Sequence, residues 1–282
     1  MEPGVEPFTE RTPRVSAARR LTRRAERDKT GRFLAEGSNA LECAIELAQR
    51  DPRAIHEVFV TERFASRNAD LLATAAQAGA RVSPVTESAA AALSETVTPQ
   101  GVVTVCELLD RPLAEALSGA PMLVAVLVGI ADPGNAGTVL RVADAAGADA
   151  VLFAGDSVDP YNGKAVRASA GSLFHLPIAR SRVISDVLAA CTTVGLRLVA
   201  ADAHAEDDLD DATDSGLLAQ PTAWLFGSEA HGLDDATAHA AHTALRVPIH
   251  GAAESLNLAT AAAVCLYASA RAQRQRNAGA TR

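Results

Sequence analysis

Three stretches of the sequence combine glycine with polar residues that can hold a ligand, and each stretch includes or follows an apolar run. The first, residues 132–137 (DPGNAG), precedes a predicted helix that carries Arg141. The second is residues 224–232 (WLFGSEAHG), and the third is residues 246–257 (RVPIHGAAESLN). Open α/β sheets bind ligands in the loops at the carboxyl ends of their strands. The pattern therefore predicts that the three loops come together into one pocket.

The polar side chains of these loops form a small set, namely Asn135, Arg141, Glu229, Ser255 and Asn257. Residues 134–137 have the wrong spacing for a dinucleotide-binding fingerprint, and the chain contains no Walker A sequence. Ser228 lies in Gly-Ser-Glu, which does not match the G-x-S-x-G nucleophile elbow. What remains is a site that contains neither a nucleophile nor a metal.

Most of these residues also have a purely structural interpretation. Asn135 can turn or cap its loop, and Ser255 can be the N-cap of the last helix. Glu229 and Asn257 can be first-turn residues. Arg141 is different, because it lies one turn into the predicted helix, near the positive end of the helix dipole. We expect its guanidinium to reach an anion or a polarised oxygen.

Strands and helices alternate along the chain and predict two α/β domains. We expect a basic arm at residues 1–30, a smaller domain at 31–108, a linker at 109–121 and a larger domain at 122–282. The strands of the larger domain are almost continuous apolar runs, which indicate a mainly parallel sheet with helices on both faces. Residues 202–214 are rich in Asp and Glu and are expected to form a solvated loop without a site.

The net charge is −8, but basic residues gather near the N-terminus. Between positions 11 and 32 the only acidic residues are Glu26 and Asp28, and the basic ones are Arg11, Arg14, Arg19, Arg20, Arg23, Arg24, Arg27, Lys29 and Arg32. The C-terminal tail adds Arg271, Arg274, Arg276 and Arg282. Such a distribution is typical of nucleic-acid binding. A solvated, partly disordered arm explains the charge equally well.

Composition limits the class of protein. Of 282 residues, 48% are hydrophobic and 21% charged, an ordinary globular balance. No apolar run has the length of about 18 residues that a membrane span needs, and the N-terminus lacks a signal-peptide core, so we expect a cytoplasmic protein. The four cysteines, Cys43, Cys106, Cys191 and Cys265, are scattered and have no histidine at metal spacing. We interpret them as reduced, buried residues and expect no metal site.

Together, the three loops resemble the motifs of the SpoU (TrmH-like) branch of the SPOUT RNA methyltransferases. Asn135-x-Gly137-x-x-x-Arg141 looks like the first motif, residues 225–232 like the second and residues 247–257 like the third. Within the branch, the chain is similar to the thiostrepton-resistance-like 23S rRNA methyltransferases. Weaker similarity lies at residues 33–37 (FLAEG) and 97–101 (VTPQG), and residues 167–171 (RASAG) through Leu176-Pro177 are a further similarity within the larger domain. The first two of these stretches suggest the family's N-terminal substrate-binding domain.

The resemblance implies a fold and a cofactor that composition does not reveal. The C-terminal part of the sheet would thread a trefoil knot, which is exceptional among protein topologies, and the protein would be a homodimer. S-adenosylmethionine would be the methyl donor. By motif position, Gly227, Val247 and Leu256 would contact this cofactor, and the remaining cofactor-binding residues would be their motif neighbours Leu225, Phe226, Gly232 and Ile249.

The implied reaction is transfer of a methyl group to a ribose 2′-hydroxyl of RNA. Arg141 would stabilise the developing charge on the 2′-oxygen rather than act as a literal base, because guanidinium resists deprotonation. Asn135 and Glu229 would position Arg141 or the ribose, while Ser255 and Asn257 would shape the methyl-transfer loop. The extra N-terminal domain favours 23S rRNA as the substrate. A tRNA methyltransferase, a non-catalytic RNA-binding protein with a knotted dimer scaffold, and an ordinary nucleotide-dependent enzyme stay open.

Overall fold

The computed structural model describes residues 6–280, with side chains described as far as Arg276. Within these residues the chain forms two compact units. Unit 1 contains the chain up to Leu109 and, in addition, the segment Asp159–His175. Unit 2 contains Asp110–Val158 and the chain from Leu176 onward. The segment Asp159–His175 therefore leaves the larger domain of the sequence and folds with the smaller one.

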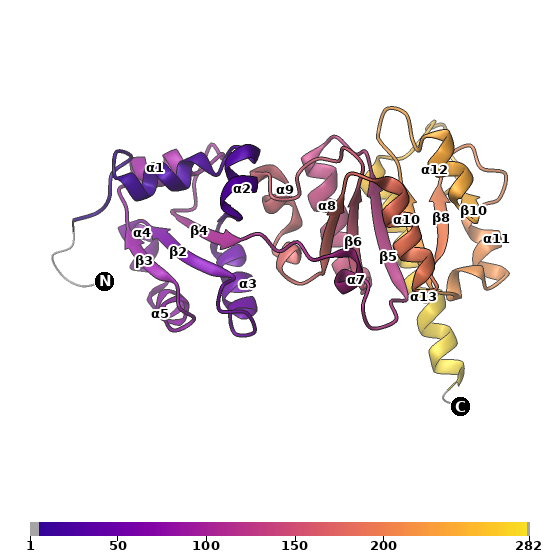
Figure 1. Ribbon diagram of the computed structural model, residues 1–282, viewed down its shortest axis with the longest axis horizontal. Coiled ribbons are helices and arrows are strands. Elements are labelled where there is room, and N and C mark those ends of the chain that lie inside the picture. Colours follow the sequence, from indigo (N-terminus) through magenta and orange to yellow (C-terminus); the bar gives the residue numbers. More distant parts are fainter. Residues whose placement is uncertain (1–5, 281–282) are drawn as a thin grey trace. The chain divides into compact units, whose positions relative to one another are not determined.

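Unit 1 is built on a mixed sheet of four strands in the order β1-β4-β2-β3 (Figure 1). Strand β4 is antiparallel to both β1 and β2, whereas β3 is parallel to β2. The strands are β1 (Arg32–Glu36), β2 (Ile55–Val60), β3 (Arg81–Pro84) and β4 (Val102–Glu107). The helices are α1 (Pro13–Arg20), α2 (Arg24–Thr30), α3 (Ser38–Ala48), α4 (Glu62–Ala65), α5 (Ala69–Gln77), α6 (Glu87–Leu93), α9 (Gly163–Ser169) and η1 (Ser172–Phe174).

The N-terminal basic segment is not a separate arm in the part of the chain that the structure describes. Val15, Ala18 and Leu21 are buried against Phe59 and Leu93, so helix α1 and the residue after it belong to the core of unit 1. These three apolar positions recur every three residues and share one helix face, while most of the arginines lie on the other. The expected arm at residues 1–30 is corrected for residues 13–30. Residues 1–5 of that arm, and Arg282 of the basic tail, lie outside the described residues.

A buried ion pair ties the returning segment into unit 1. Arg27 and Asp159 are 3% and 4% exposed, and Arg27 Nη2 lies 2.7 Å from Asp159 Oδ2. Arg27 Nη1 also donates to the carbonyl oxygens of Leu21 and Thr22, which satisfies the rest of the buried guanidinium. The prediction that residues 122–282 form one domain is therefore corrected for residues 159–175, because no local pattern reveals a partner 132 residues away.

Unit 2 has a six-stranded sheet in the order β10-β8-β9-β5-β6-β7, and every neighbouring pair of strands in it is parallel. The prediction of a mainly parallel sheet is confirmed. The strands are β5 (Leu123–Val128), β6 (Ala150–Ala154), β7 (Ile178–Ser181), β8 (Arg197–Ala201), β9 (Thr222–Phe226) and β10 (Thr243–Leu245). The helices are α7 (Leu113–Ala116), α8 (Pro133–Ala146), α10 (Ile184–Thr193), α11 (Leu209–Asp214), η2 (Leu217–Ala219), α12 (Asp235–Ala240) and α13 (Leu258–Ala280).

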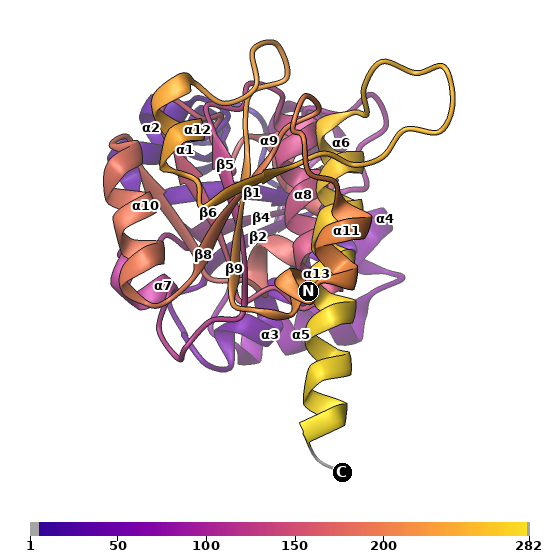
Figure 2. The same ribbon diagram turned by 90° about the vertical axis from the view of Figure 1, so that its right-hand side faces the viewer.

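Helices cover both faces of this sheet (Figure 2). Val124 and Val126 of β5 pack toward Leu188 and Cys191 of α10 on one face. On the other face α13 packs along α8, and the indole of the buried Trp224 donates to Ser269 Oγ at 2.9 Å. Because both faces are covered, the strands are apolar throughout, as parallel strands usually are.

The strand order creates a switch point between β5 and β9. From β5 the chain proceeds outward to β6 and β7, whereas β9 and β8 lie on the opposite side of β5. The loops after β5 and β9 therefore begin side by side at the same edge of the sheet. Such switch points are the usual ligand-binding crevices of open α/β sheets.

Two helix starts differ from the sequence-based prediction. Helix α8 begins at Pro133 and not at residue 137, because the Asp132 side chain caps it by accepting from the backbone N–H of Asn135 at 2.8 Å. Arg141 consequently lies in the third turn, beyond the reach of the positive helix end, so the dipole argument for this residue no longer holds. Helix α13 begins at Leu258, and its N-cap is Asn257 rather than Ser255.

All four cysteines are buried. Burial raises the pKa of the thiols of Cys191 and Cys265 to about 12 and raises the pKa of Cys106 as well. A thiol that stays protonated is a poor nucleophile and a poor metal ligand. In the described residues, three or more His, Cys, Asp or Glu side chains are nowhere grouped to hold a metal ion. None of the helices within residues 6–280 is long and apolar enough to span a membrane.

Replacing Arg27 tests the attachment of the returning segment. We expect Arg27→Ala to lower the free energy of unfolding by about 3–5 kcal/mol, because Asp159 loses its buried counter-charge. The control is Arg24→Ala in the same helix, whose ion pair with Asp28 is exposed, and we expect a loss below about 1 kcal/mol. Urea denaturation followed by circular dichroism measures both, and equal effects would contradict the structural role of the buried pair.

Candidate ligand pocket

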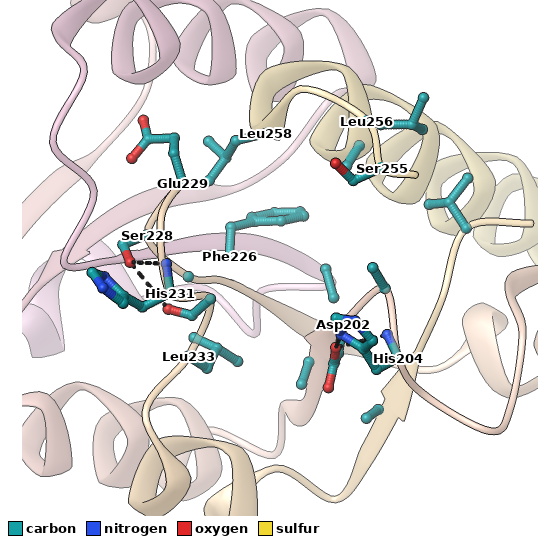
Figure 3. Close-up of a pocket in the computed structure, with 18 of the residues that line it drawn as sticks. Asp202, His204, Phe226, Ser228, Glu229, His231, Leu233, Ser255, Leu256 and Leu258 are labelled. Carbon is teal, nitrogen blue, oxygen red and sulfur yellow. Dashed lines mark hydrogen bonds and ion pairs between the residues drawn. The ribbon is translucent and has the colours of Figure 1, made fainter. Parts of the chain in front are cut away.

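A pocket of about 730 Å³ opens at the carboxyl ends of β8, β9 and β10. This volume lies within the range of small-molecule and cofactor sites. Figure 3 shows Phe226 near its centre, with side chains from the second and third loops around it. The lining residues are Ala200, Ala201, Asp202, Ala203, His204, Phe226, Gly227, Ser228, Glu229, Ala230, His231, Gly232, Leu233, Ala238, Ala244, Leu245, Val247, Ile249, Ser255, Leu256, Asn257, Leu258 and Ala261.

A hydrogen-bonded chain of side chains joins the three glycine-bearing loops. The Asn135 amide donates to Glu229 Oε1 at 2.9 Å, and the Asn257 amide donates to Asn135 Oδ1 at 3.1 Å. Glu229 also accepts from the backbone N–H groups of Ala131 and Asp132, at 3.2 and 3.3 Å. Each loop thus contributes one member to a single network. The three loops come together, as predicted, but the second and third loops line the pocket and the first does not.

The network keeps Glu229 ionised. Partial burial raises the pKa of this carboxyl, but the hydrogen bonds from Asn135 and from backbone N–H groups outweigh burial, and the pKa falls below its usual value. A carboxylate that accepts several N–H bonds is stabilised in its charged form. Glu229 therefore acts as an acceptor that holds the first loop to the second.

Asn257 has two structural tasks in this arrangement. Its side-chain oxygen accepts from the backbone N–H groups of Ala259 and Thr260, at 2.9 and 3.4 Å, and so caps helix α13. Its side-chain nitrogen reaches Asn135 at the same time. The start of the last helix and the loop after β5 are consequently fixed to each other.

Gly227 is required by the path of the second loop. A Cβ atom at this position would lie 2.1 Å from the carbonyl carbon of Gly232, because residues 228–232 fold back in a tight turn. Ser228 and Gly232 exchange two backbone hydrogen bonds of 2.9 Å, and Gly232 has a φ of +68°. The loop therefore brings its own backbone to the pocket wall, where few side-chain atoms intervene.

The structure places most of the predicted cofactor-binding residues in the pocket wall. They are Phe226, Gly227, Gly232, Val247, Ile249 and Leu256. Leu225 is the exception, since it is fully buried in the sheet core and faces α10 rather than the pocket. The reason is the alternation of side chains along β9, which points Phe226 and Leu225 to opposite faces.

The predicted catalytic residues divide into two groups. Glu229, Ser255 and Asn257 line the pocket, and Asn135 is bonded to two of them. Arg141 is exposed on α8 and is not part of the pocket wall. Within residues 6–280 its guanidinium forms neither a hydrogen bond nor an ion pair. Arg141 is thus available to a partner from outside unit 2.

The wall formed by Asp202, Ala203 and His204 was not expected from the sequence. Residues 202–214 were interpreted as a solvated loop without a site, and this interpretation is wrong for its first three residues. They follow β8, which lies between β9 and β10 in the sheet. A signal was present, because these residues also occupy the carboxyl end of a predicted parallel strand.

Two family models match the chain, one for each of the two domains expected from the sequence. The model of the SpoU rRNA methylase family matches residues 122–267, which is more than half of the chain. The chain belongs to the SpoU rRNA methylase family. A model of the MRM3-like substrate binding domain matches residues 12–104, a range that includes α1 and α2. The resemblance inferred from the three motifs is confirmed.

Individual relatives extend the similarity over almost the whole chain. The 23S rRNA (guanosine(2553)-2′-O)-methyltransferase RlmP of Bacillus subtilis is 32% identical over 254 residues, covering 90% of this chain and 94% of the relative. The 23S rRNA (guanosine-2′-O-)-methyltransferase RlmB of Ralstonia nicotianae is 33% identical over 79% of this chain and 90% of its own length. The crystal structure of an AdoMet-bound rRNA methyltransferase from Sinorhizobium meliloti has a TM-score of 0.81 at 30% identity, covering 94% of this chain and 97% of that one.

The fold of the second loop gives a direct test. Gly227→Ala places a methyl group against the backbone of Gly232, and we expect it to lower the free energy of unfolding by about 1–3 kcal/mol or more. The control is Gly251→Ala in the third loop, where a Cβ meets no atom within 4 Å, and we expect a change within about 0.5 kcal/mol. Trp224 is the only tryptophan and lies three residues from Gly227, so its fluorescence during urea unfolding reports on this region. Two equally stable variants would contradict the tight turn.

Proposed function

We propose that this protein is an S-adenosylmethionine-dependent methyltransferase that acts on a ribose 2′-hydroxyl of 23S rRNA. The observation that carries the proposal is the network of Glu229, Asn135 and Asn257, which joins the three loops beside a pocket of cofactor size. The relatives described above are named as 23S rRNA 2′-O-methyltransferases, and one solved relative holds AdoMet. The predictions of an RNA methyltransferase and of S-adenosylmethionine as its cofactor are confirmed.

The pocket fits the adenosyl part of this cofactor. Apolar side chains of Phe226, Val247 and Leu256 provide surfaces for a planar base, and Gly227 leaves backbone groups accessible beside them. In Figure 3, Leu258 at the start of α13 and Leu233 just after the second loop lie on opposite sides of Phe226. We assign the cofactor to these side chains and to the backbone of both loops.

S-adenosylmethionine supplies a methyl group that is already activated by the sulfonium to which it is attached. The protein therefore has to align the ribose hydroxyl and stabilise the negative charge that develops on its oxygen. We assign charge stabilisation to Arg141, whose positively charged guanidinium has no partner within residues 6–280. The hydroxyl proton leaves to a phosphate oxygen or to water.

Asn135, Glu229 and Asn257 act as positioning residues in this proposal. Their side chains bond to one another, so they fix the start of α8, which carries Arg141, relative to the pocket wall. This assignment keeps the role expected from the sequence, in which Asn135 and Glu229 position Arg141 or the ribose, and adds Asn257 to it. Ser255 lines the pocket and keeps its proposed role in shaping the methyl-transfer loop.

The RNA itself is assigned to unit 1. Arg19, Arg23 and Lys29 are exposed on or beside α1 and α2, whereas Arg14 and Arg27 are committed to Glu57 and Asp159. Phosphate contacts need local positive charge and not a positive total. This surface would bind the phosphates of ribosomal RNA. The protein would work in the cytoplasm, where ribosomes are present.

We further propose a homodimer formed through unit 2. Val264 and Tyr267 of α13 are 39% and 48% exposed. They lie three residues apart and so share one face of the helix. Exposed large apolar side chains on one helix face are typical of an interaction surface. A second copy of the chain is the occupant that family membership favours. The trefoil knot stays a prediction.

Loss of the Arg141 guanidinium separates catalysis from cofactor binding. We expect Arg141→Ala to reduce methyl transfer at least about a hundredfold, as removal of a charge-stabilising group does, with cofactor affinity changed less than about twofold. The control is Arg182→Ala, which removes another exposed arginine of unit 2, and its activity should stay within about threefold. Transfer of a labelled methyl group to RNA and calorimetry with the cofactor measure the two quantities. An Arg141→Ala variant with most of its activity would contradict the assigned role.

The RNA surface requires substitution rather than deletion, because removing residues 13–30 would expose the core under α1. We expect the triple variant Arg19→Gln, Arg23→Gln and Lys29→Gln to bind RNA more weakly and to reduce the slope of log affinity against log salt by about 0.7–0.9 for each lost phosphate contact. A second triple variant, Arg53→Gln, Arg63→Gln and Arg67→Gln, makes the same change of charge at other exposed positions of unit 1. Filter binding at several salt concentrations measures the slopes. Equal slopes in the wild type and the first variant would remove this surface from the proposal.

A further inference from the structure

The charges around the pocket are unbalanced. Among the residues that line it, all within the described chain, Asp202 and Glu229 are acidic and neither lysine nor arginine occurs. Figure 3 shows the two carboxylates on different sides of Phe226, with Asp202 beside His204 and Glu229 at the opposite wall. A ligand in this pocket therefore lies between two negative side chains with no fixed positive charge among the lining residues.

The two carboxylates differ in the number of hydrogen bonds that they accept from the protein. Glu229 accepts hydrogen bonds from the Asn135 amide and from two backbone N–H groups. Asp202 accepts one backbone hydrogen bond, from His204 N–H to Oδ1 at 2.9 Å, and the His204 ring lies 3.5 Å from the same oxygen. Asp202 Oδ2 accepts no hydrogen bond within residues 6–280. Asp202 is thus the carboxylate with an oxygen left for a ligand.

Asp202 is held in place from two directions. Its backbone N–H donates to the carbonyl of Leu245 in β10 at 3.1 Å. The loop that follows is held by Arg246, whose Nη1 donates to the carbonyl oxygens of Ala205, at 2.8 Å, and Glu206, while its Nη2 donates to Asp208 at 3.2 Å. The arginine next to the pocket is therefore committed to the backbone and side chain of this loop, and it does not neutralise the pocket.

We propose that Asp202 is a specificity-determining residue that makes the pocket prefer the positively charged methyl donor over the demethylated product. The inference rests on the proposed function. The donor carries a sulfonium, an ammonium and a carboxylate, with a net charge of +1. After methyl transfer the sulfur is a neutral thioether and the net charge is zero. A fixed negative charge within several ångströms attracts the donor and has no net charge to attract in the product.

The preference has a functional consequence. Donor and product share the adenosyl group and the amino-acid tail, so apolar and backbone contacts bind both equally. A pocket with these contacts alone is inhibited by its own product as the product accumulates. A carboxylate at the wall weakens product binding relative to donor binding, which favours release after each turnover.

The test is calorimetry of the full-length protein with S-adenosylmethionine and with S-adenosylhomocysteine, at pH 8, where ordinary imidazoles are neutral. The variant is Asp202→Asn, which removes the charge and keeps an oxygen that can accept from His204 N–H. We expect the donor to bind about three- to tenfold more weakly and the product to change less than twofold. The control is Asp210→Asn, which makes the same change of charge at an exposed position of helix α11, outside the pocket wall, and should alter neither affinity.

Salt provides a second readout in the same experiment. The ratio of donor to product affinity should fall with ionic strength in the wild type and fall less steeply in Asp202→Asn, because the Asp202 carboxylate is partly exposed to solvent and only Glu229 remains charged in the variant. Equal weakening of both ligands would mean that Asp202 only shapes the turn, and unchanged affinities would mean that it does not reach the ligand. Either result overturns the inference and leaves the proposed function in place. A wild-type protein that binds neither ligand would overturn the proposed function, and the inference with it.

Discussion

The carboxylate of Glu229 is the point on which the site depends. It belongs to the loop after β9, and it accepts hydrogen bonds from the loop after β5 through the Asn135 amide and the backbone N–H groups of Ala131 and Asp132. These donors hold its pKa below the usual value, so the acceptor remains charged under working conditions. Asn257 extends the connection to the start of α13. Asn135 lies 94 residues before Glu229 and 122 residues before Asn257 in the sequence. A few hydrogen bonds thus fix the three loops to one another at one edge of the sheet.

The parallel sheet makes this network possible. Strands β5 and β9 are neighbours, and all carboxyl ends lie at the same edge, so the loops after them have to meet. In the proposed mechanism, the residues of this network position Arg141 and the pocket wall without contacting the reacting atoms themselves. Such an arrangement is rigid because regular elements hold both ends of each loop, and rigid positioning is the main requirement when the cofactor already carries the activated group.

In unit 1, the number of basic residues in the sequence overstates the charge that is available on the surface. Nine basic residues in the N-terminal segment suggest one extended binding surface. In the structure, Arg27 is buried against Asp159 and Arg14 pairs with Glu57, so these two serve the fold. The other basic residues of α1 and α2 are mostly exposed, and these are the residues to which phosphate binding is proposed. A segment that looks like a solvated tail is therefore a folded part of unit 1.

The sequence by itself determined the local elements and the family. Apolar runs fixed the parallel strands, and the glycines and polar residues of the three loops identified the site, because turns and backbone approach restrict residue type at each position. Only the tertiary structure decided which residues meet. The return of Asp159–His175 to unit 1, the wall at Asp202 and the pairing of Glu229 with Asn135 each join residues far apart in the chain. Periodicity and spacing are local properties, whereas a buried pair such as Arg27 and Asp159 is selected by the space that the whole fold encloses.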